Sequence, residues 1–486
     1  MANAIKKTAA IALAAGLSFA GSAGIAAQDA FAQDTAVNEQ AQEKYSLTIQ
    51  KRAGNWEDNS DYTGGALDSA PGEAAGAGFT FKVEQVTPAA DDINNASEAK
   101  PVKDGYSSEG TTDANGSLKL ENLPAGVYRV TETGVPEGSN YVPGPPFLVS
   151  VPVTNKQGTG TINDVVVYPK NTETTVEKSV VDADKNSGDT VNYTITANAP
   201  VVPAGNVLTS FAVQDAYRAS ELTNVTVKEV RVNGEVVPAT EYEVKDGTIT
   251  GVDETDADTT KTINFVGNGL ARVSQQQAAK VEVFLTATLQ PVGDGEVINN
   301  ARTIVRGPNT TSDSEPKETP WNKVTTYLGK LRLEKTDGSG TKLAGATFDL
   351  YRCDAKGELK GEAIETGAES GEDGIVNFDK SLHVTDYEND AEVEAAKRYC
   401  AVETKAPEGY QKLSKPIIIT FKREDRTEDL TVGEVTYKAV QKTEQVVNTK
   451  PLLPSTGGMG ILIVALAGLA IIGGGAYAAR RNSQSA

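Results

Sequence analysis

Apolar and polar residues alternate in short runs along most of this 486-residue chain, from residue 45 to residue 448. Clear examples are residues 47–51, 189–196 and 399–404, which are rich in Thr, Val, Ile and Tyr. Such runs are typical of half-buried β-strands, because successive side chains of a strand face opposite sides of the sheet. The pattern therefore predicts extended, all-β domains.

The N-terminal end of the chain breaks this alternation. Two lysines precede an uncharged stretch rich in Ala, Leu and Ile at residues 8–27, and the small residues Ala30 and Ala32 follow it. A basic start, an apolar core and small residues are the three parts of a secretory signal peptide. A membrane anchor is the weaker interpretation, because the apolar core is short and interrupted by Gly and Ser. We predict a signal peptide at residues 1–32, with cleavage after Ala32 or alternatively after Ala27.

The C-terminal end breaks the alternation as well. Residues 458–479 carry no charge, and Arg480 and Arg481 follow them directly. A helix of this length spans about 33 Å, which is enough to cross the hydrocarbon core of a bilayer. Basic residues after such a span favour a cytoplasmic location for the chain end. We therefore predict a transmembrane helix with a short basic tail.

Two strand-rich segments of the chain resemble each other. In each, a Lys lies in the first strand, an acid lies near the middle and an Asn lies in the last strand. The Lys-to-Glu spacings are 81 and 68 residues, and the Glu-to-Asn spacings are 39 and 45. Constant order with variable loop length predicts two copies of one β-sandwich. The repeated positions are Lys51, Glu132 and Asn171 in the first segment and Lys335, Glu403 and Asn448 in the second.

The region between these copies is a third strand-rich unit, in which the residues that separate the strands follow a different pattern. It has its own Lys178 near the start, Asp215 in an inner strand, and Asn299 and Asn300 near the end, followed by a polar linker at residues 307–320. The chain is therefore predicted to contain three tandem sandwich domains between its two terminal segments. The predicted parts are a signal peptide (1–32), an N-terminal domain (33–171), a middle domain (172–325), a C-terminal domain (326–450) and a C-terminal tail (451–486).

Composition and charge exclude several classes of function. The chain has 46 Lys and Arg against 66 Asp and Glu, a net charge of −20, which disfavours nucleic-acid binding. Its single His383 excludes a His-rich metal site and disfavours a Ser-His-Asp or Cys-His mechanism. We therefore expect no metal, no cofactor and no enzymatic activity on other molecules.

The recurring Lys, acid and Asn suggest a reaction within the chain. A Lys amine attacks an Asn side-chain carbonyl only when it is neutral, and burial lowers the pKa of a Lys. A carboxylic acid in the same apolar site has its pKa raised, so it stays protonated and polarises the Asn carbonyl. The first and last strands of such a sandwich are neighbours, which brings the two partners together. The pattern indicates an amide bond formed with loss of ammonia.

The two cysteines, Cys353 and Cys400, both fall in the predicted C-terminal domain. An even pair in an exported chain predicts a disulfide, which contributes about 2–4 kcal/mol to stability.

A short motif near the C-terminus adds a specific resemblance. Leu453, Pro454, Ser455, Thr456 and Gly457 precede the predicted membrane span and the basic tail. This order of three parts is similar to the cell-wall sorting signal of Gram-positive surface proteins. The resemblance implies that a membrane sortase cleaves between the Thr and the Gly and holds the Thr carbonyl as a thioester on its cysteine.

Residues 399–410 resemble the E-box of pilin and collagen-adhesin B-type (Cna B-like) domains, because Tyr399, Glu403 and Gly409 stand at its characteristic positions. The resemblance implies a Lys–Asn isopeptide bond in the C-terminal domain with the E-box Glu as the assisting acid. The middle domain resembles the A-type (Cna A-like) domain, and the N-terminal domain has a degraded E-box. The implied bonds are Lys335–Asn448 with Glu403, Lys178–Asn299 (alternatively Asn300) with Asp215, and Lys51–Asn171 with Glu132.

Tyr168, Pro169 and Lys170 end the predicted N-terminal domain. Together with the sorting signal and the E-boxes, they are similar to the pilin motif of shaft pilins assembled by sortases, although the Trp that often opens that motif is missing. The resemblance implies that Lys170 of one subunit attacks the thioester at Thr456 of another. Repetition of this step makes a covalent head-to-tail fibre.

The same resemblance implies the partners and the location of the protein. The partners would be identical subunits, pilin-class and housekeeping sortases, tip and base pilins, peptidoglycan and host surface receptors. The protein would be secreted and anchored in the cell wall as a pilus of a Gram-positive cell. Two other interpretations use the same anchor: a monomeric adhesin that binds host matrix, and, less favoured, a wall-anchored hydrolase with two catalytic carboxylates.

Overall fold

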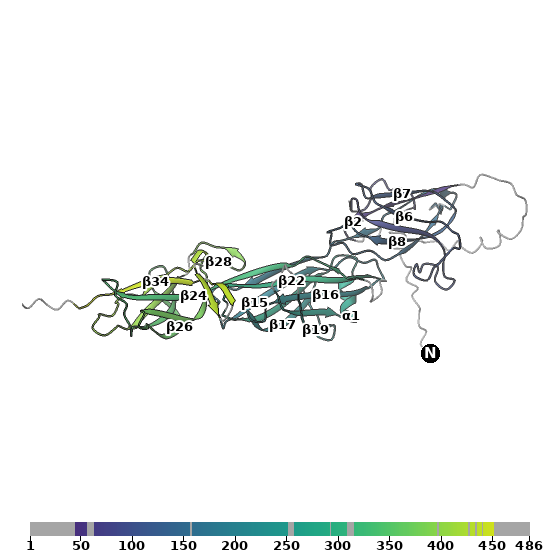
Figure 1. Cartoon of the computed structure of the whole chain (residues 1–486). Coiled ribbons are helices and arrows are strands. Elements are labelled where there is room, and N and C mark those ends of the chain that lie inside the picture. The colour runs from purple at the N-terminus through teal and green to yellow at the C-terminus, as the bar shows by residue number, and fades with distance from the viewer. Residues whose placement is uncertain are drawn as a thin grey trace, which may run out of the picture. The chain divides into compact units, whose positions relative to one another are not determined.

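The computed structural model describes residues 44–451, except 56–62, 156–157, 251–256, 292, 309–314, 396–397, 426–427, 433–434 and 440. This described part is almost entirely β, with one short α-helix, α1 (Asn268–Val273), and one 3-10 turn, η1 (Arg423–Asp425) (Figure 1). The all-β prediction is confirmed. None of the helices in the described residues is long and apolar enough to span a membrane. The predicted signal peptide, sorting motif and membrane helix all lie outside the described residues.

The described chain divides into two compact units. The first runs to Gln290 and also contains Glu296–Thr326, whereas the second contains Pro291–Gly295 and the residues from Tyr327 onward. The predicted boundary after residue 171 falls inside the first unit, so this division stays a prediction.

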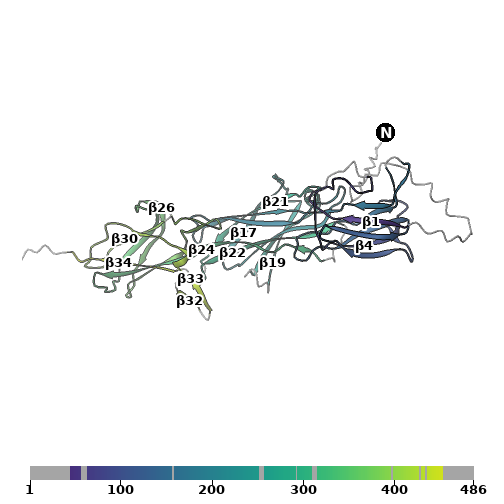
Figure 2. The ribbon, with the colours of Figure 1, turned by 90° about the horizontal axis from the view of Figure 1, so that it is seen from above.

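The first part of unit 1 is a sandwich of two sheets. Side chains of both sheets, among them Leu47, Phe81 and Tyr128, form one buried core, and Figure 2 shows one strand of each sheet, β1 and β4. In the first sheet β1 is parallel to β12 and antiparallel to β7. One sheet, in the order β12-β1-β7, consists of β1 (Tyr45–Gln50), β7 (Ser117–Leu123) and β12 (Asp164–Val167). The other, in the order β5-β4-β8-β9 with β6 beside β4, consists of β4 (Thr80–Thr87), β5 (Lys100–Pro101), β6 (Ser107–Thr111), β8 (Gly126–Gly134) and β9 (Phe147–Val151).

A short sheet extends the line of β1 and β12. Its order is β13-β2-β3, and β13 is parallel to β2. A separate pair, β10 with β11, completes this part. These strands are β2 (Arg52–Ala53), β3 (Glu73–Ala74), β10 (Val153–Thr154), β11 (Thr161–Ile162) and β13 (Lys170–Asn171).

The rest of unit 1 is a second, larger sandwich. Buried and exposed residues alternate along its inner strands, as in β15, where Val191, Tyr193 and Ile195 are buried. One sheet, in the order β14-β15-β21-β17-β18, consists of β14 (Thr175–Val181), β15 (Thr190–Asn198), β17 (Leu222–Val232), β18 (Glu235–Val236) and β21 (Lys280–Leu289). The other includes β19 (Tyr242–Thr248), β20 (Thr259–Phe265), β16 (Leu208–Tyr217) and β22 (Glu296–Pro308) in this order, with β23 (Lys317–Glu318) beside β22.

Unit 2 is a third sandwich built around β24 (Asn322–Asp337), whose residues from Tyr327 onward belong to this unit. β24 is parallel to β34 (Gln441–Asn448) and antiparallel to β27 (Ile375–His383), and Figure 1 shows β24 beside β34. The facing sheet, in the order β26-β25-β30-β31, consists of β25 (Thr347–Cys353), β26 (Leu359–Glu369), β30 (Arg398–Lys405) and β31 (Ile417–Ile419). Two hairpins pair β28 (Tyr387–Glu388) with β29 (Ala391–Glu392) and β32 (Glu428–Val432) with β33 (Val435–Ala439).

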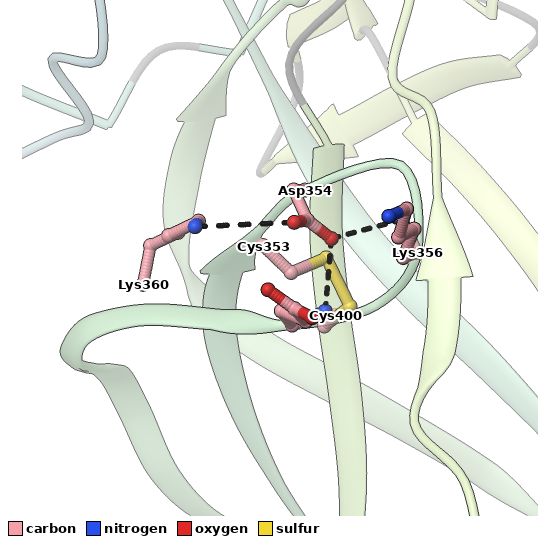
Figure 3. Close-up of a disulfide and its surroundings, with 6 residues drawn as sticks. Cys353, Asp354, Lys356, Lys360 and Cys400 are labelled. Carbon is pink, nitrogen blue, oxygen red and sulfur yellow. Dashed lines mark hydrogen bonds and ion pairs between the residues drawn. A yellow bond between two sulfur atoms is a disulfide. The ribbon is translucent and has the colours of Figure 1, made fainter.

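The predicted disulfide is confirmed: Cys353 and Cys400 are bonded, with their Cα atoms 5.7 Å apart (Figure 3). The bond joins the end of β25 to β30, the strand that also carries Glu403. The turn after Cys353 is held by the Asp354 carboxylate, which accepts the backbone N–H groups of Lys356 (2.8 Å) and Glu358 (3.0 Å). The hydrogen bond from Glu358 contributes most to lowering the pKa of Asp354. Both cysteines are buried, so the disulfide is part of the interior of unit 2.

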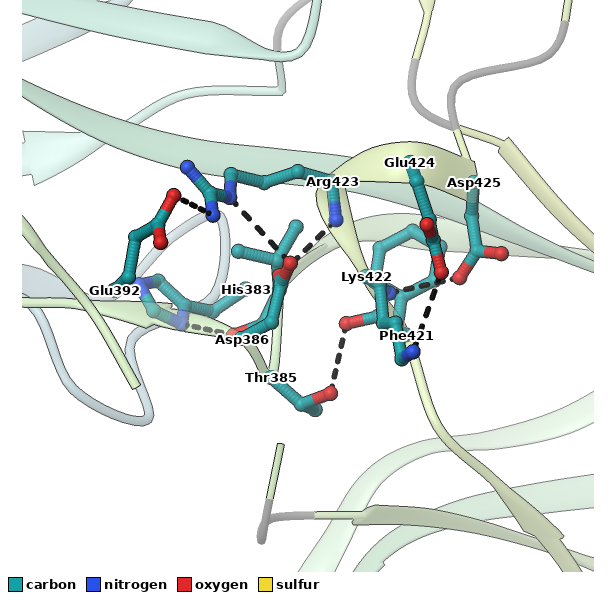
Figure 4. Close-up of polar contacts among 10 residues, drawn as sticks. His383, Thr385, Asp386, Glu392, Phe421, Lys422, Arg423, Glu424 and Asp425 are labelled. Carbon is teal, nitrogen blue, oxygen red and sulfur yellow. Dashed lines mark hydrogen bonds and ion pairs between the residues drawn. The ribbon is translucent and has the colours of Figure 1, made fainter. Parts of the chain in front are cut away.

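The single histidine is a buried residue of unit 2. His383 is 1% exposed, and its Nδ1 lies 2.7 Å from the carbonyl oxygen of Val384. In Figure 4 the neighbouring loop is tied to η1 through Asp386, which accepts the backbone N–H of Arg423 at 3.0 Å. The Arg423 guanidinium also donates to Glu392 at 2.9 Å. These contacts fix the loop after β27 against the residues that follow β31.

Candidate cross-linking sites

The site in unit 2 begins with two buried residues on parallel strands. Lys335 of β24 pairs with Val446 of β34, and Asn448 lies two positions farther along β34. Residues two apart in a strand face the same side of the sheet. Both residues are at most 1% exposed, and Glu403 from the facing sheet is 1% exposed as well. The strands thus bring together the three residues that the sequence singled out.

Hydrogen bonds fix the nitrogen end of the Asn448 amide. Its Nδ2 donates to both carboxylate oxygens of Glu403, at 3.0 and 3.1 Å, and to the carbonyl oxygen of Gln411 at 2.9 Å. The backbone N–H of Leu413 donates to Glu403 at 2.7 Å and so orients the carboxylate. Asn448 Oδ1 has no hydrogen-bond partner among the described residues. The amide nitrogen is therefore beside the acid, while the carbonyl oxygen has no partner among the described residues.

The Lys335 amine lies between backbone carbonyls. Its Nζ donates to the oxygens of Thr336 (3.1 Å) and Val446 (3.2 Å). Burial lowers the pKa of Lys335, and the charges of Glu403 and Asp337 oppose this effect. A lowered pKa enlarges the neutral fraction of the amine, which is the form that attacks a carbonyl.

The first sandwich of unit 1 repeats this backbone arrangement. Asn171 pairs with Ala53 on parallel strands, so it lies two positions beyond the point opposite Lys51. The backbone N–H of Lys51 donates to Gly116 at 2.7 Å, just as that of Lys335 donates to Gly374 at 2.7 Å. The agreement of these contacts indicates that the two sandwiches contain two copies of one site.

The side chains of this first site differ in one respect. Lys51 Nζ lies 2.9 Å from the Glu132 carboxylate and 5.1 Å from the centre of the Phe79 ring. Asn171 Nδ2 donates to both Glu132 oxygens at 3.0 Å, and the N–H of Gly144 donates to the same carboxylate at 2.8 Å. Burial lowers the pKa of Lys51, and its ion pair with Glu132 opposes the change. Here the acid contacts both partners of the expected bond.

The middle sandwich brings Lys178 into an ion pair with Asp215, and both side chains are fully buried. Lys178 Nζ also lies 3.4 Å from the carbonyl oxygen of Asn300, to which it donates. Burial lowers the pKa of Lys178 and raises the pKa of Asp215, while their mutual attraction opposes both shifts. Burial of both groups favours the neutral amine and the neutral acid over the ion pair.

Strand register distinguishes the two candidate asparagines. In the antiparallel pair of β16 and β22, Asp215 is opposite Ala301 and Tyr217 is opposite Asn299. Alternation therefore places Asn299 on the same face as Asp215 and Asn300 on the other face. Asn300 Nδ2 donates to the carbonyl of Ala216 at 3.2 Å. The Asn299 amide is 1% exposed and has no hydrogen-bond partner within the described chain, which favours Asn299 as the residue facing the site.

Comparison with known proteins gives the family. A family model described as "Gram-positive pilin subunit D1, N-terminal domain" matches residues 25–172, and the SpaA "Prealbumin-like fold domain" matches residues 329–436. The chain is 30% identical over 401 residues to "Fimbrial subunit type 2" of Actinomyces naeslundii, covering 75% of this chain and 70% of the relative. The chain belongs to the family of Gram-positive pilin subunits.

Further relatives agree with this assignment. "Fimbrial subunit type 1" of Actinomyces viscosus is 30% identical over 420 residues, which cover 77% of this pilin and 76% of the relative. The solved structure of the full-length major pilin SpaD from Corynebacterium diphtheriae has a TM-score of 0.67 and 31% identity, covering 86% of this pilin and 99% of that chain. The protein is thus homologous to fimbrial subunits and major pilins of covalently polymerised pili, and the composition that disfavoured common enzymes fits a structural pilin.

The pilin motif has a feature that the sequence did not predict. Lys170 is only 3% exposed, and its Nζ donates to the carbonyl oxygen of Asn55 at 3.0 Å. Tyr168 is also buried, and its hydroxyl accepts the N–H of Leu67 at 2.9 Å. A small pocket is lined by Lys170 together with Glu132 and Asn171. The candidate polymerisation lysine is therefore buried, bound to the Asn55 carbonyl, and next to the candidate internal bond.

Two glycines that sequence analysis did not single out complete the repeated sites. Gly116 and Gly374 have φ of +74° and +73°, and a Cβ at either would lie 2.7 or 2.6 Å from the carbonyl oxygen of Lys51 or Lys335. Each follows Asn or Asp, and Asn-Gly and Asp-Gly pairs are strong turn signals. These two turn signals were therefore visible in the sequence, but the contacts of the glycines with Lys51 and Lys335 were not.

Proposed function

We propose that this pilin is the shaft subunit of a covalent pilus, joined head to tail through Lys170 and Thr456 and stiffened by three internal Lys–Asn bonds. A pilin-class sortase would catalyse the joining step. A housekeeping sortase would transfer the finished fibre to peptidoglycan, with tip and base pilins at its ends, and the fibre would support adhesion to host surfaces. The net negative charge would keep neighbouring fibres soluble and apart.

The internal bonds follow from the chemistry of the buried triads. The neutral Lys Nζ attacks the Asn Cγ, and a new C–N bond forms as the carbonyl becomes tetrahedral. The acid passes a proton to Nδ2, which leaves as ammonia, and takes up the proton that the amine loses. The products are one secondary amide and one ammonia molecule, with the acid regenerated. The expected pairs are Lys335–Asn448, Lys178–Asn299 and Lys51–Asn171, assisted by Glu403, Asp215 and Glu132.

One observation carries this part of the proposal. In two sandwiches the Asn lies two register positions past the partner of the Lys, and its amide nitrogen donates to a buried Glu. A surface ion pair contributes about 0–1 kcal/mol and does not require such burial. Three buried polar residues in the same geometry are costly to fold unless they react or pair. Their repetition supports a reaction within each domain.

The joining step also uses a lysine amine as its nucleophile, but the bond forms between two subunits. The Lys170 amine of one subunit attacks the Thr456 carbonyl, which the sortase holds as a thioester, and the sortase thiolate leaves as the amide forms. Because Lys170 is buried and donates to the Asn55 carbonyl, this hydrogen bond must break and the amine must become exposed before the attack.

The polymer is tested by Lys170→Ala in the native host. Wall extracts of the wild type should show a ladder of high-mass bands on denaturing gels, and the variant should show monomer only. Lys119→Ala, at an exposed lysine of the same domain, is the matched control and should keep the ladder. A ladder that persists in the Lys170 variant would refute the proposed linkage. A wild type without any ladder would favour the monomeric adhesin.

The internal bonds are tested by intact mass. Each bond removes one ammonia, so the purified chain should be lighter by about 17 Da per bond, beyond the loss from the disulfide. Linked peptides from digestion would identify each pair. A chain with the full unreacted mass refutes the internal cross-links without affecting the polymer test.

A further inference from the structure

The middle sandwich contains a buried tyrosine that the mechanism above does not use. Tyr193 of β15 is 1% exposed and is opposite Val180 in β14, two positions from the pair of Lys178 with Ile195. The Lys178 Nζ lies 5.1 Å from the centre of its ring. Its hydroxyl has no hydrogen-bond partner among the described residues. Buried tyrosine hydroxyls normally find a partner, so this one calls for an explanation.

The surroundings of the hydroxyl supply acceptors that also lack partners. Asn299 Oδ1 and Asp215 Oδ2 are both buried and have no hydrogen-bond partner in the described part of the chain. Burial and the nearby Asp215 and Asp182 carboxylates raise the pKa of Tyr193, whereas the Thr326 and Asn299 side chains lower it. Asn299 shares one strand face with Asp215, and the Lys178 Nζ that pairs with Asp215 lies 5.1 Å from the Tyr193 ring, so the four residues form one buried cluster.

The Thr326 hydroxyl donates to Asp182 at 2.6 Å, and it does not accept the tyrosine proton, because no hydrogen bond of the described residues reaches the Tyr193 hydroxyl. Asp215 faces Lys178 with its other oxygen, Oδ1. The acceptor that gains negative charge during the reaction is Asn299 Oδ1. A neutral phenol is a donor suited to that oxygen, because its proton is retained over the whole range in which the amine is reactive.

We propose that the Tyr193 hydroxyl donates a hydrogen bond to Asn299 Oδ1 as Lys178 attacks, and so stabilises the oxyanion of the tetrahedral intermediate. This inference rests on the proposed Lys178–Asn299 bond. The new bond forms between Nζ and Cγ, and the bond from Cγ to Nδ2 breaks. The proton of the amine passes through Asp215 to the leaving ammonia. The phenol keeps its own proton throughout, so the step is balanced without any other reactant.

The other two sites hold the Asn amide differently from the middle site. In those sites the Asn nitrogen is hydrogen-bonded to the Glu carboxylate, and the Lys51 amine faces the rings of Phe79 and Phe81, which carry no hydroxyl. In the middle site the acid pairs with the Lys, and neither atom of the Asn amide has a hydrogen-bond partner among the described residues. In the middle site Tyr193 is the nearby donor that can bind the amide oxygen.

The test is the rate of bond formation in Tyr193→Phe, which keeps the ring and removes only the hydroxyl. The full chain is made by cell-free synthesis, synthesis is stopped, and digested samples are followed in time for the peptide that links residues 178 and 299. Loss of one oxyanion donor typically slows a reaction by about 10²–10³-fold, and a slowing of this size is expected here. Tyr242→Phe, at a half-buried tyrosine of β19, should react at the wild-type rate.

A second measurement separates catalysis from packing. In an Asn299→Ala background, where no bond forms, Tyr193→Phe should leave the thermal midpoint of the chain unchanged. A wild-type rate in Tyr193→Phe overturns the inference and leaves the proposed bond intact, and a slow rate with an equal loss of stability in the Asn299→Ala background also overturns it. If the wild type never yields the linked peptide, the proposed bond and the inference fail together.

Discussion

Asn448 lies two register positions past the partner of Lys335 on the neighbouring parallel strand, with both side chains buried on one face of the sheet. The first and last strands of unit 2 therefore meet at these two residues. The proposed covalent bond there would close a loop over nearly the whole unit. Pulling on the ends of the chain would load this bond directly and leave the intervening strands unloaded, which suits a shaft subunit.

Replacing the acid of this site should abolish the bond. Glu403→Gln keeps the size of the side chain but cannot pass a proton, so the unit 2 share of the mass deficit, about 17 Da, should disappear. Loss of a cross-link that closes a loop of roughly a hundred residues should cost about 4–5 kcal/mol, by analogy with a disulfide. Intact mass and urea unfolding measure both effects. Glu408→Gln, at an exposed position of the same E-box, should retain the bond, and a linked Glu403→Gln chain would contradict the assignment.

The glycine behind Lys335 should be as important as the acid. A Cβ at Gly374 would lie 2.6 Å from the Lys335 carbonyl oxygen, so Gly374→Ala must displace β24 at the reactive residue. We expect a lower fraction of the Lys335–Asn448 peptide and a loss of about 1–3 kcal/mol. Gly409→Ala also has positive φ (+81°) but meets nothing within 4 Å, so it tests strain alone. Equal cross-linking in the two variants would show that the close approach is unimportant.

Lys170 should become more accessible when the backbone at Gly54, next to Asn55, is strained. Gly54 has a φ of +117°, and no atom lies within 4 Å of an added Cβ, so Gly54→Ala acts only through backbone strain. Strain of about 1–2 kcal/mol would raise the open population about 5- to 30-fold. Lys170 should then react faster with an amine-acylating reagent, as measured by peptide mass spectrometry.

Two controls sharpen this prediction. Gly138→Ala introduces similar strain at φ +75° without facing Lys170, and Lys119 reports any general change in labelling. If Lys170 is labelled at the same rate in the wild type and in Gly54→Ala, the segment at Asn55 does not control access to it.

Local periodicity explains what the sequence predicted well. Alternation in β15 and β21 is a property of neighbouring residues, so it is visible without a structure. The repeated order of Lys, Glu and Asn was likewise readable, and the structure brings each set together. The cysteine pair could be assigned because only two cysteines exist.

Contacts between distant residues explain what the sequence did not predict. The hydrogen bond from Lys170 to the Asn55 carbonyl joins residues 115 positions apart, and nothing in either local sequence predicts it. The preference for Asn299 over Asn300 depends on the register between β16 and β22, which a shift of one residue would reverse. The role inferred for Tyr193 depends on which buried groups lack partners, and only a packed interior defines that.

The disulfide should stabilise unit 2 independently of the isopeptide bond. Cys353 and Cys400 are 47 residues apart, and the double variant Cys353→Ala/Cys400→Ala should lose about 2–4 kcal/mol. The Lys335–Asn448 peptide should still form, because Glu403 remains on β30 between β25 and β31. Urea unfolding combined with peptide mass spectrometry checks both statements. Loss of the linked peptide in the double variant would mean that the disulfide positions the acid.

The buried amine of Lys51 should make stability depend on pH when its bond cannot form. Burial lowers the pKa of Lys51 below 10.5, so between the folded-state pKa and 10.5 the unfolded chain holds a proton that the folded chain lacks. By linkage the free energy of unfolding then rises with pH across this window, by up to about 1.4 kcal/mol per pH unit, and the burial cost is fully present below it. Asn171→Ala should show this rise, measured by denaturant unfolding with pulse proteolysis of the N-terminal domain between pH 7 and 10.5. Lys51→Met removes the amine and should lack the rise, so parallel curves for the two variants would mean that the Lys51 amine is not buried in the unreacted domain.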